Sequence, residues 1–190
     1  MALPAEKNTF TFADYLTWNE DEHIELIDGK AVMMAPPSTA HQLISMELSR
    51  QLANFLEGKK CRAIPAPFAV RLFEGANDTP ADVRTVVEPD ISVICDPSKL
   101  DDIGCKGAPD FIIEVLSPST QRHDRVTKFN LYLSAGVREY WIVDPVRKDA
   151  QSFVLEDGRY AAKEFGTSAD QMKVSVLEDC ILDLAQVFGE

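Results

Sequence analysis

The sequence is short of positive charge, and its cysteines form no recognisable motif. Its 19 lysines and arginines face 31 aspartates and glutamates, so the formal net charge is -12. Because phosphate-binding surfaces are usually basic, this balance argues against broad adhesion to nucleic acid or to an anionic membrane. Cys61, Cys95, Cys105 and Cys180 lack C-x-x-C spacing, so they indicate neither a zinc site nor a disulfide framework and favour a reduced, intracellular protein.

Long apolar runs are also missing. No stretch approaches the length needed to span a membrane, and the N-terminal segment "MALPAEKNTFTFADYL" lacks the basic region and apolar core of a secretory signal. We therefore expect a cytoplasmic protein without a membrane partner. No internal repeat, low-complexity tract or long linker interrupts the chain, so we expect a single domain over residues 1–190.

The residue pattern predicts a mixed sheet with helices on its faces, which is an α/β or α+β fold. Asp28-Gly29 and Asp157-Gly158 each separate two extended segments and predict hairpins near the two ends of the chain. A long helix is expected from the N-cap Ser38 to Gly58. Further extended segments are predicted at 61–73, 85–94, 110–117 and 139–144, with a helix within 120–136. The order strand, helix, strand over 110–144 predicts a crossover between parallel strands.

The stretch "GAPDFIIEVLSPS", residues 107–119, contains a carboxylate in an apolar strand. Strand alternation places Ile112, Glu114 and Leu116 on one face, so Glu114 emerges on a definite side. Burying a carboxylate is costly unless a partner or a metal ion takes up its charge. A second carboxylate, Asp90, lies in the extended segment 85–94.

If these strands are neighbours, Asp90 and Glu114 converge and repel each other unless a proton or a cation lies between them. A divalent ion such as Mg²⁺ would remove this conflict, generate an attacking hydroxide and stabilise charge on a phosphodiester. The alternative is that both carboxylates lie at strand ends, where water or a structural ion pair satisfies them.

Lys128 is the candidate cation for such a site. On the predicted helix it lies one turn from both Asp124 and Tyr132, on a line that would face Glu114. Spacing alone favours a different interpretation, in which Asp124 and Lys128 form a solvent-exposed ion pair.

Several ordered segments resemble one known family. They are "ELIDGKAVMM", "STAHQLISMEL", "EPDISVI", "GAPDFIIEVLSPST" and "RHDRVTKFNLYLSAGVREYWIVDP". Together they resemble the Uma-two family of restriction endonucleases, in the PD-(D/E)xK nuclease superfamily, over roughly residues 10 to 185. The resemblance implies a restriction-endonuclease-like core, a mixed central sheet flanked by helices, in which Asp90 and Glu114 hold Mg²⁺ or Mn²⁺.

One position departs from the superfamily pattern. That pattern places a lysine two residues after the acid, on the same strand face, and this sequence has Leu116 there. The resemblance implies that the lysine has moved to the following helix, at Lys128. It also points to Glu25 as an extra metal or water ligand, for which a cross-strand ion pair is an alternative. His41 would approach the metal or a phosphate, or be a hydrogen-bonded structural histidine.

The sequence therefore predicts a Mg²⁺-dependent endonuclease acting on DNA, in which Lys128 orients water or stabilises charge at phosphorus. A local basic patch of Arg122, Arg125, Lys128 and Arg138 would serve a substrate phosphate. Two alternatives stay open: an inactive binding or regulatory module with the same fold, and an enzyme acting on RNA or another phosphoester. A homodimer is compatible with cleavage of both strands.

Overall fold

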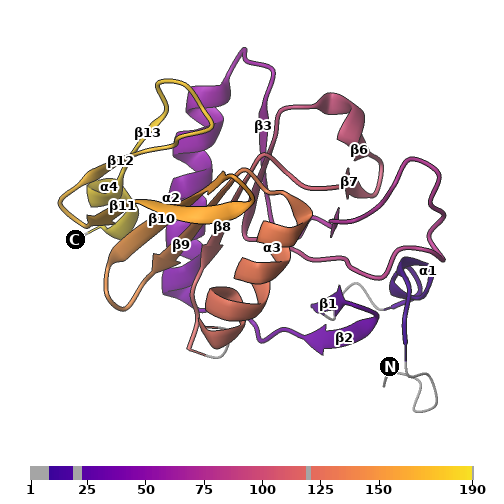
Figure 1. The fold of residues 1–190 in the computed structure, drawn as a ribbon. Helices are drawn as coiled ribbons and strands as arrows, with labels where there is room; N and C mark the ends of the chain where they lie inside the picture. The colour runs from indigo at the N-terminus through magenta and orange to yellow at the C-terminus, as the bar shows by residue number, and fades with distance from the viewer. Residues whose placement is uncertain (1–8, 19–22, 119–120, 190) are drawn as a thin grey trace.

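A six-stranded mixed sheet forms the centre of the protein in the computed structural model, which describes residues 9–18, 23–118 and 121–189 (Figure 1). The strand order is β11-β10-β9-β8-β5-β3, and β8 and β9 are parallel whereas the other neighbours are antiparallel. The strands are β3 (Arg62–Pro65), β5 (Ile91–Ile94), β8 (Phe111–Val115), β9 (Glu139–Asp144), β10 (Asp149–Glu156) and β11 (Arg159–Thr167). The predicted mixed fold with parallel strands around a helix is confirmed.

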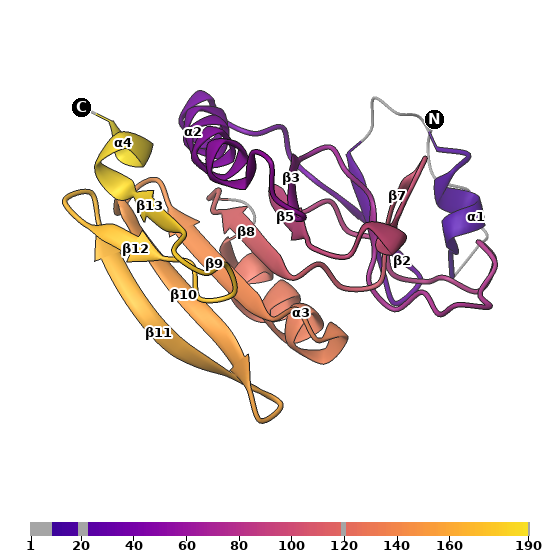
Figure 2. The same ribbon diagram turned by 90° about the horizontal axis from the view of Figure 1, so that it is seen from above.

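Helices α2 (Thr39–Leu56) and α3 (Phe129–Ala135) lie on opposite sides of this sheet (Figure 2). The core is divided into two apolar clusters, and the side chains of strand β8 alternate between them. Phe111, Ile113 and Val115 pack in the cluster that contains the buried stripe of α2. Ile112 and Leu116 pack in the cluster that contains the buried residues of α3. The predicted alternation is therefore confirmed, and Glu114 emerges on the side of α3.

The sequence locates the ends of both helices well. The Ser38 hydroxyl accepts a hydrogen bond from the His41 backbone N–H at 3.2 Å and begins α2. Gly136, in the left-handed region at φ 84°, ends α3. The helix expected within 120–136 differs in one respect: it contains a π-helical segment, η2 (His123–Lys128), directly before α3.

The N-terminal hairpin packs beside the central sheet. Strands β1 (Ile24–Ile27) and β2 (Lys30–Met33) turn at Asp28-Gly29, as predicted, and helix α1 (Phe12–Tyr15) precedes them. Leu26 forms a bridge to Val86, just ahead of β5. The C-terminal hairpin β10–β11 also turns where it was predicted, at Asp157-Gly158.

Several smaller elements complete the fold. They are β4 (Val70–Arg71), β6 (Leu100–Asp101), β7 (Gly104–Lys106), β12 (Gln171–Lys173), β13 (Ile181–Asp183), α4 (Leu184–Phe188) and the 3-10 turn η1 (Pro97–Lys99). Strand β5 begins at Ile91, so Asp90 stands directly before the strand rather than inside it. None of the helices in the described ranges is both long and apolar enough to cross a bilayer.

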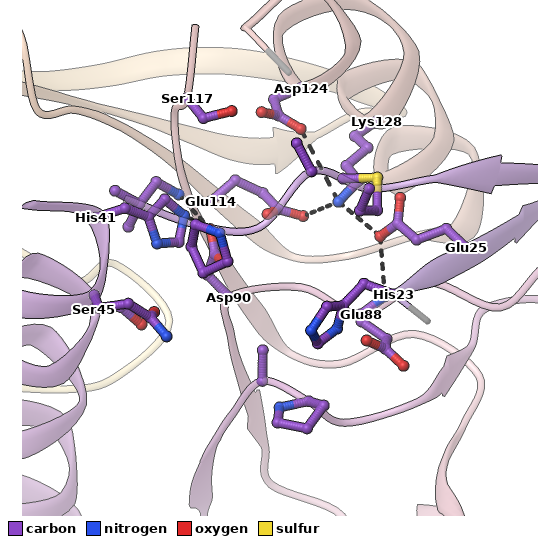
Figure 3. A pocket seen from close by; sticks show the side chains of 17 residues that line it. His23, Glu25, His41, Ser45, Glu88, Asp90, Glu114, Ser117, Asp124 and Lys128 are labelled. Atoms are coloured by element: carbon purple, nitrogen blue, oxygen red, sulfur yellow. Dashed lines mark hydrogen bonds and ion pairs between the residues drawn. The ribbon is translucent and has the colours of Figure 1, made fainter. Parts of the chain in front are cut away.

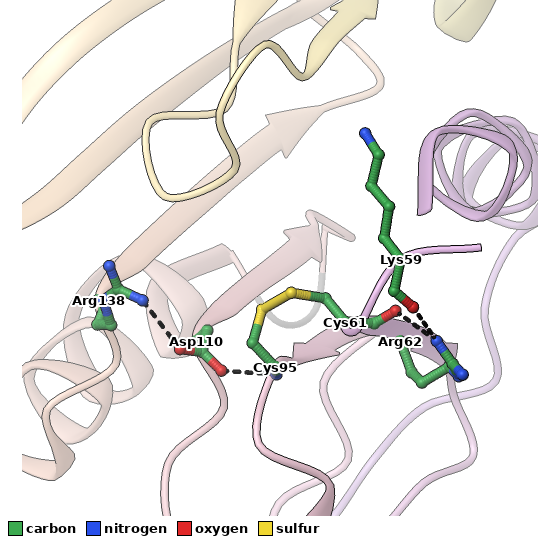
Figure 4. Close-up of a disulfide and its surroundings, with 6 residues drawn as sticks. All are labelled: Lys59, Cys61, Arg62, Cys95, Asp110 and Arg138. Carbon is green, nitrogen blue, oxygen red and sulfur yellow. Dashed lines mark hydrogen bonds and ion pairs between the residues drawn. A yellow bond between two sulfur atoms is a disulfide. The ribbon is translucent and has the colours of Figure 1, made fainter. Parts of the chain in front are cut away.

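The expectation of four reduced cysteines is wrong for two of them. Cys61 and Cys95 form a disulfide between segments 34 residues apart in sequence (Figure 4). In the register of β3 and β5, Arg62 pairs with Ile94, so the two cysteines are the next residues to face each other. Sequence spacing does not reveal this proximity because it arises from strand pairing. Cys105 and Cys180 are free and buried.

Removing the disulfide is expected to destabilise the protein. Closure of a loop of this length restricts the unfolded chain, so the double variant Cys61→Ser/Cys95→Ser should lose about 3–4 kcal/mol of unfolding free energy. Urea unfolding followed by circular dichroism measures the loss. A thiol reductant should lower the stability of the unchanged protein and leave the double variant unaffected. Equal stability of the two proteins under oxidising conditions contradicts the prediction.

Candidate active site

A pocket of about 270 Å³ opens where β5 begins and β8 ends, against the η2 segment (Figure 3). Its lining includes five carboxylates and one lysine: Glu25, Glu88, Asp90, Glu114, Asp124 and Lys128. His41 of α2 lines it as well. The structure thus brings all five sequence-predicted site residues, Asp90, Glu114, Lys128, Glu25 and His41, to one place.

Asp90 and Glu114 face each other because of the antiparallel pairing of β5 and β8. Ile91 pairs with Ile113 in that register, so the residue before β5 lies opposite Glu114. Asp90 Oδ2 accepts a hydrogen bond from the Val115 backbone N–H at 2.7 Å, which fixes the carboxylate at the end of β8. The convergence expected from the sequence is present.

His41 also contacts the Asp90 carboxylate. Its Nε2 lies 3.1 Å from Asp90 Oδ2, and its ring is almost fully buried. Burial lowers the pKa of His41, but the hydrogen bond and the charge of Asp90 outweigh it, so the pKa lies above its ordinary value. This shift favours the imidazolium form, in which Nε2 donates to the carboxylate.

Lys128 is buried in a group of carboxylates, with its side chain only 2% exposed. Its Nζ lies 2.8 Å from Glu25 Oε1, 2.9 Å from Glu114 Oε1 and 4.0 Å from Asp124 Oδ1, as the dashed lines of Figure 3 mark. Burial lowers the pKa of Lys128, but these carboxylates raise it well above its ordinary value, so the amine is charged. The solvent-exposed pair that spacing alone favoured is therefore wrong.

Glu25 and Glu114 respond differently to this single cation. Burial raises the pKa of Glu25, but Lys128 outweighs it and holds the pKa at about 2. Burial raises the pKa of Glu114 well above its ordinary value, and the charges of Asp90, Asp124 and Glu25 raise it further against the effect of Lys128. At Glu114 the ammonium of Lys128 therefore does not offset burial and the neighbouring carboxylates.

The donor set is compatible with a divalent cation. An ion between Asp90 and Glu114 would supply positive charge, and carboxylate oxygens are the ligands that Mg²⁺ prefers. Glu25 Oε2 is buried and has no hydrogen-bond partner among the described residues. No cluster of three or more ligating side chains is found in the described ranges, so water and substrate oxygens would complete the coordination, as is usual for Mg²⁺.

The structure differs from two predictions about charged residues, namely the partner of Glu25 and the basic patch. Glu25 pairs with Lys128, 103 positions later in sequence, whereas its cross-strand neighbour in the hairpin is Val32. The expected basic patch does not form, since Lys128 is enclosed by carboxylates. Arg125 Nη2 lies 3.4 Å from Asp144 Oδ2, and Arg138 pairs with Asp110 at the opposite end of β8 and β9.

Sequence reasoning assigned no role to three residues that the structure places in or beside this site. His23 lines the pocket, and His123 Nε2 lies 3.7 Å from Glu25 Oε2. Tyr132 donates a hydrogen bond to Glu114 Oε1 at 2.5 Å. The four-residue spacing of Asp124, Lys128 and Tyr132 was the signal available for Tyr132.

The fold and the site together define a mixed α/β protein with paired carboxylates and a buried lysine where β5 begins and β8 ends. The chain matches the Uma2 family, described as "Putative restriction endonuclease", over residues 12–185, and it belongs to that family. The fold is similar to the crystal structure of a protein from Anabaena variabilis titled a "putative nuclease belonging to DUF820". The TM-score is 0.71 at 19% sequence identity, covering 94% of this chain and 97% of the other.

A curated relative is an uncharacterized protein of Synechocystis sp., 35% identical over 121 residues. The match covers 63% of this chain and 60% of that relative, so the aligned part spans less than two thirds of its length.

Loss of the buried ammonium is expected to destabilise the fold. Lys128→Met leaves Glu25 and Glu114 without their cation, and breaking a buried ion pair in this way costs about 3–5 kcal/mol of unfolding free energy. The matched control is Lys163→Met, whose partner Glu156 is exposed, so the expected loss there is less than about 1 kcal/mol. Urea unfolding measures both.

The same variant should show a defined pH dependence. Without Lys128, burial raises the folded pKa of Glu25 above its unfolded value, so the folded variant binds more protons, whereas the pKa of Glu114 is already raised in the unchanged protein. The stabilising protonation is present at about pH 5 and is lost as the pH rises to about 8, so the deficit relative to the unchanged protein should grow over that interval. A deficit independent of pH contradicts this account of the carboxylate cluster.

Proposed function

We propose that this protein is a metal-dependent endonuclease that hydrolyses DNA phosphodiester bonds. The observation that carries the proposal is the position of Lys128, whose Nζ lies 2.9 Å from Glu114 Oε1 in the pocket that Asp90 also lines. The superfamily lysine is missing from position 116, and Lys128 delivers an ammonium to the same carboxylate from the following helix. Membership of a family described as "Putative restriction endonuclease" supports the nuclease class and DNA as the substrate.

Asp90 and Glu114 are the residues that would hold Mg²⁺ or Mn²⁺. When bound, such an ion lowers the pKa of a water molecule and stabilises charge at a phosphodiester. Asp90 is oriented for this role by the Val115 N–H and by His41. His41 therefore acts through Asp90, as a residue that aims the carboxylate.

Lys128 supplies a fixed positive charge next to the reacting groups. Its role is to orient the attacking water and to stabilise the charge that develops at phosphorus. Glu25 keeps the ammonium in place through the 2.8 Å contact and holds it protonated. The buried Oε2 of Glu25 is available to accept a hydrogen bond from a water molecule in the pocket.

The position of Leu116 favours this proposal over an inactive binding module. The side chain is 5% exposed and packs in the apolar cluster on the α3 side of the sheet, where it serves the core. Leu116 stands where the superfamily pattern has a lysine, but the pocket still contains an ammonium group because Lys128 lines it. The same chemistry applies to RNA and other phosphoesters. Assays on different substrates distinguish these activities from DNA cleavage.

Substitution of Asp90 tests the proposal. Asp90→Asn removes one of two carboxylate ligands, so DNA cleavage with Mg²⁺ or Mn²⁺ should fall by at least about 100-fold. The control Asp157→Asn lies at the exposed hairpin turn, in a left-handed conformation that asparagine also adopts, and should cleave like the unchanged protein.

Cleavage is followed by gel electrophoresis of supercoiled, linear and single-stranded DNA, with RNA of matched sequence in parallel. Metal-dependent cleavage of RNA alone would move the proposal to ribonuclease activity. No cleavage above the Asp90→Asn background on any of these substrates contradicts the proposed function.

A further inference from the structure

The two candidate metal ligands are held in the same way. Asp90 Oδ2 receives two contacts, from the Val115 N–H at 2.7 Å and from His41 Nε2 at 3.1 Å. Glu114 Oε1 also receives two, from Lys128 Nζ at 2.9 Å and from the Tyr132 hydroxyl at 2.5 Å. In both carboxylates the two contacts converge on one oxygen atom.

We propose that Tyr132 is a positioning residue that orients the Glu114 carboxylate for a divalent cation, as His41 orients Asp90. This inference rests on the proposed function, because it assigns Tyr132 a part in the metal site of that enzyme.

The contact with Lys128 alone does not fix the orientation of the Glu114 carboxylate. Its ammonium lies almost equally close to Glu25 and to Glu114, at 2.8 and 2.9 Å, so its position is a compromise between two carboxylates. A single contact to one oxygen also lets the carboxylate plane rotate about its bond to the side chain. The Tyr132 hydroxyl adds a second contact to the same oxygen, Oε1, at 2.5 Å, which restrains that rotation.

The ring of Tyr132 is held independently of its hydroxyl. It is fully buried in the apolar cluster of α3, and the Tyr140 ring packs against it at 5.1 Å between centroids. The Tyr132 hydroxyl donates to Glu114 Oε1 at 2.5 Å. The phenol oxygen is the ring's single polar atom, and its hydrogen bond is directed to Glu114.

The decisive variant is Tyr132→Phe, which keeps the ring and removes the hydroxyl. Mn²⁺ binding, measured by calorimetry without DNA, should weaken by about ten-fold or more, since loss of a group that orients a metal ligand has effects of this size. The Mn²⁺ concentration that gives half-maximal cleavage should rise in parallel, with DNA affinity in metal-free buffer unchanged. Circular dichroism verifies the fold.

Two controls separate positioning from a structural role. Tyr160→Phe removes a comparable phenol hydrogen bond, to the Val137 carbonyl at 2.9 Å outside the pocket, and should leave Mn²⁺ affinity unchanged. In a Glu114→Gln background, Tyr132→Phe should change Mn²⁺ affinity no further, because Tyr132 acts through Glu114. Circular dichroism verifies the fold of the single and double variants.

The outcomes distinguish this inference from the proposal on which it rests. Equal Mn²⁺ affinity of Tyr132→Phe and the unchanged protein overturns the role of Tyr132 alone. An equal loss of affinity in the Glu114→Gln background also overturns it, since the effect would then bypass Glu114. No Mn²⁺ binding by the unchanged protein overturns both this inference and the proposed metal site.

Discussion

The buried ammonium of Lys128 is the interaction on which the site depends. It joins three parts of the chain, since Glu25 comes from the N-terminal hairpin, Glu114 from β8 and Lys128 itself from the helical segment after β8. A buried ion pair contributes little net stability because desolvation of the charges offsets their attraction. The main effect of this arrangement is therefore to fix the relative positions of the three elements. A shift of any one of them would leave an uncompensated charge in the core.

The sheet supplies the second constraint. Alternation along β8 gives one face to α2 and the other to α3, and Glu114 emerges among apolar residues on the α3 side. Asp90 stands immediately before the neighbouring strand, so antiparallel pairing places the two carboxylates at the same edge. Burial of Glu25, Glu114 and Lys128 strengthens the electrostatic interactions among them. The gathering of several carboxyl groups around Lys128 follows from this geometry.

Local features of this chain could be predicted from its sequence, whereas contacts between distant segments could not. The long helix at 38–58 and the outward side of Glu114 follow from capping residues and alternation, which are properties of short stretches. The location of Lys128 depends on how its helix packs against β8, and spacing alone pointed to the surface. Tyr132 was missed for the same reason, because its partner lies on a strand. The pairing of Cys61 with Cys95 likewise depends on strand order, which no local pattern encodes.

The central claim is that Asp90 and Glu114 share a divalent ion beside the Lys128 ammonium. A crystal structure of the protein with Mn²⁺, using anomalous scattering to locate the metal, tests it most directly. The account predicts an anomalous peak at coordination distance, about 2.1 Å, from one oxygen of each carboxylate, with Lys128 still between Glu25 and Glu114. Absence of a peak between the two carboxylates, or a Lys128 side chain that points into solvent, would contradict the account.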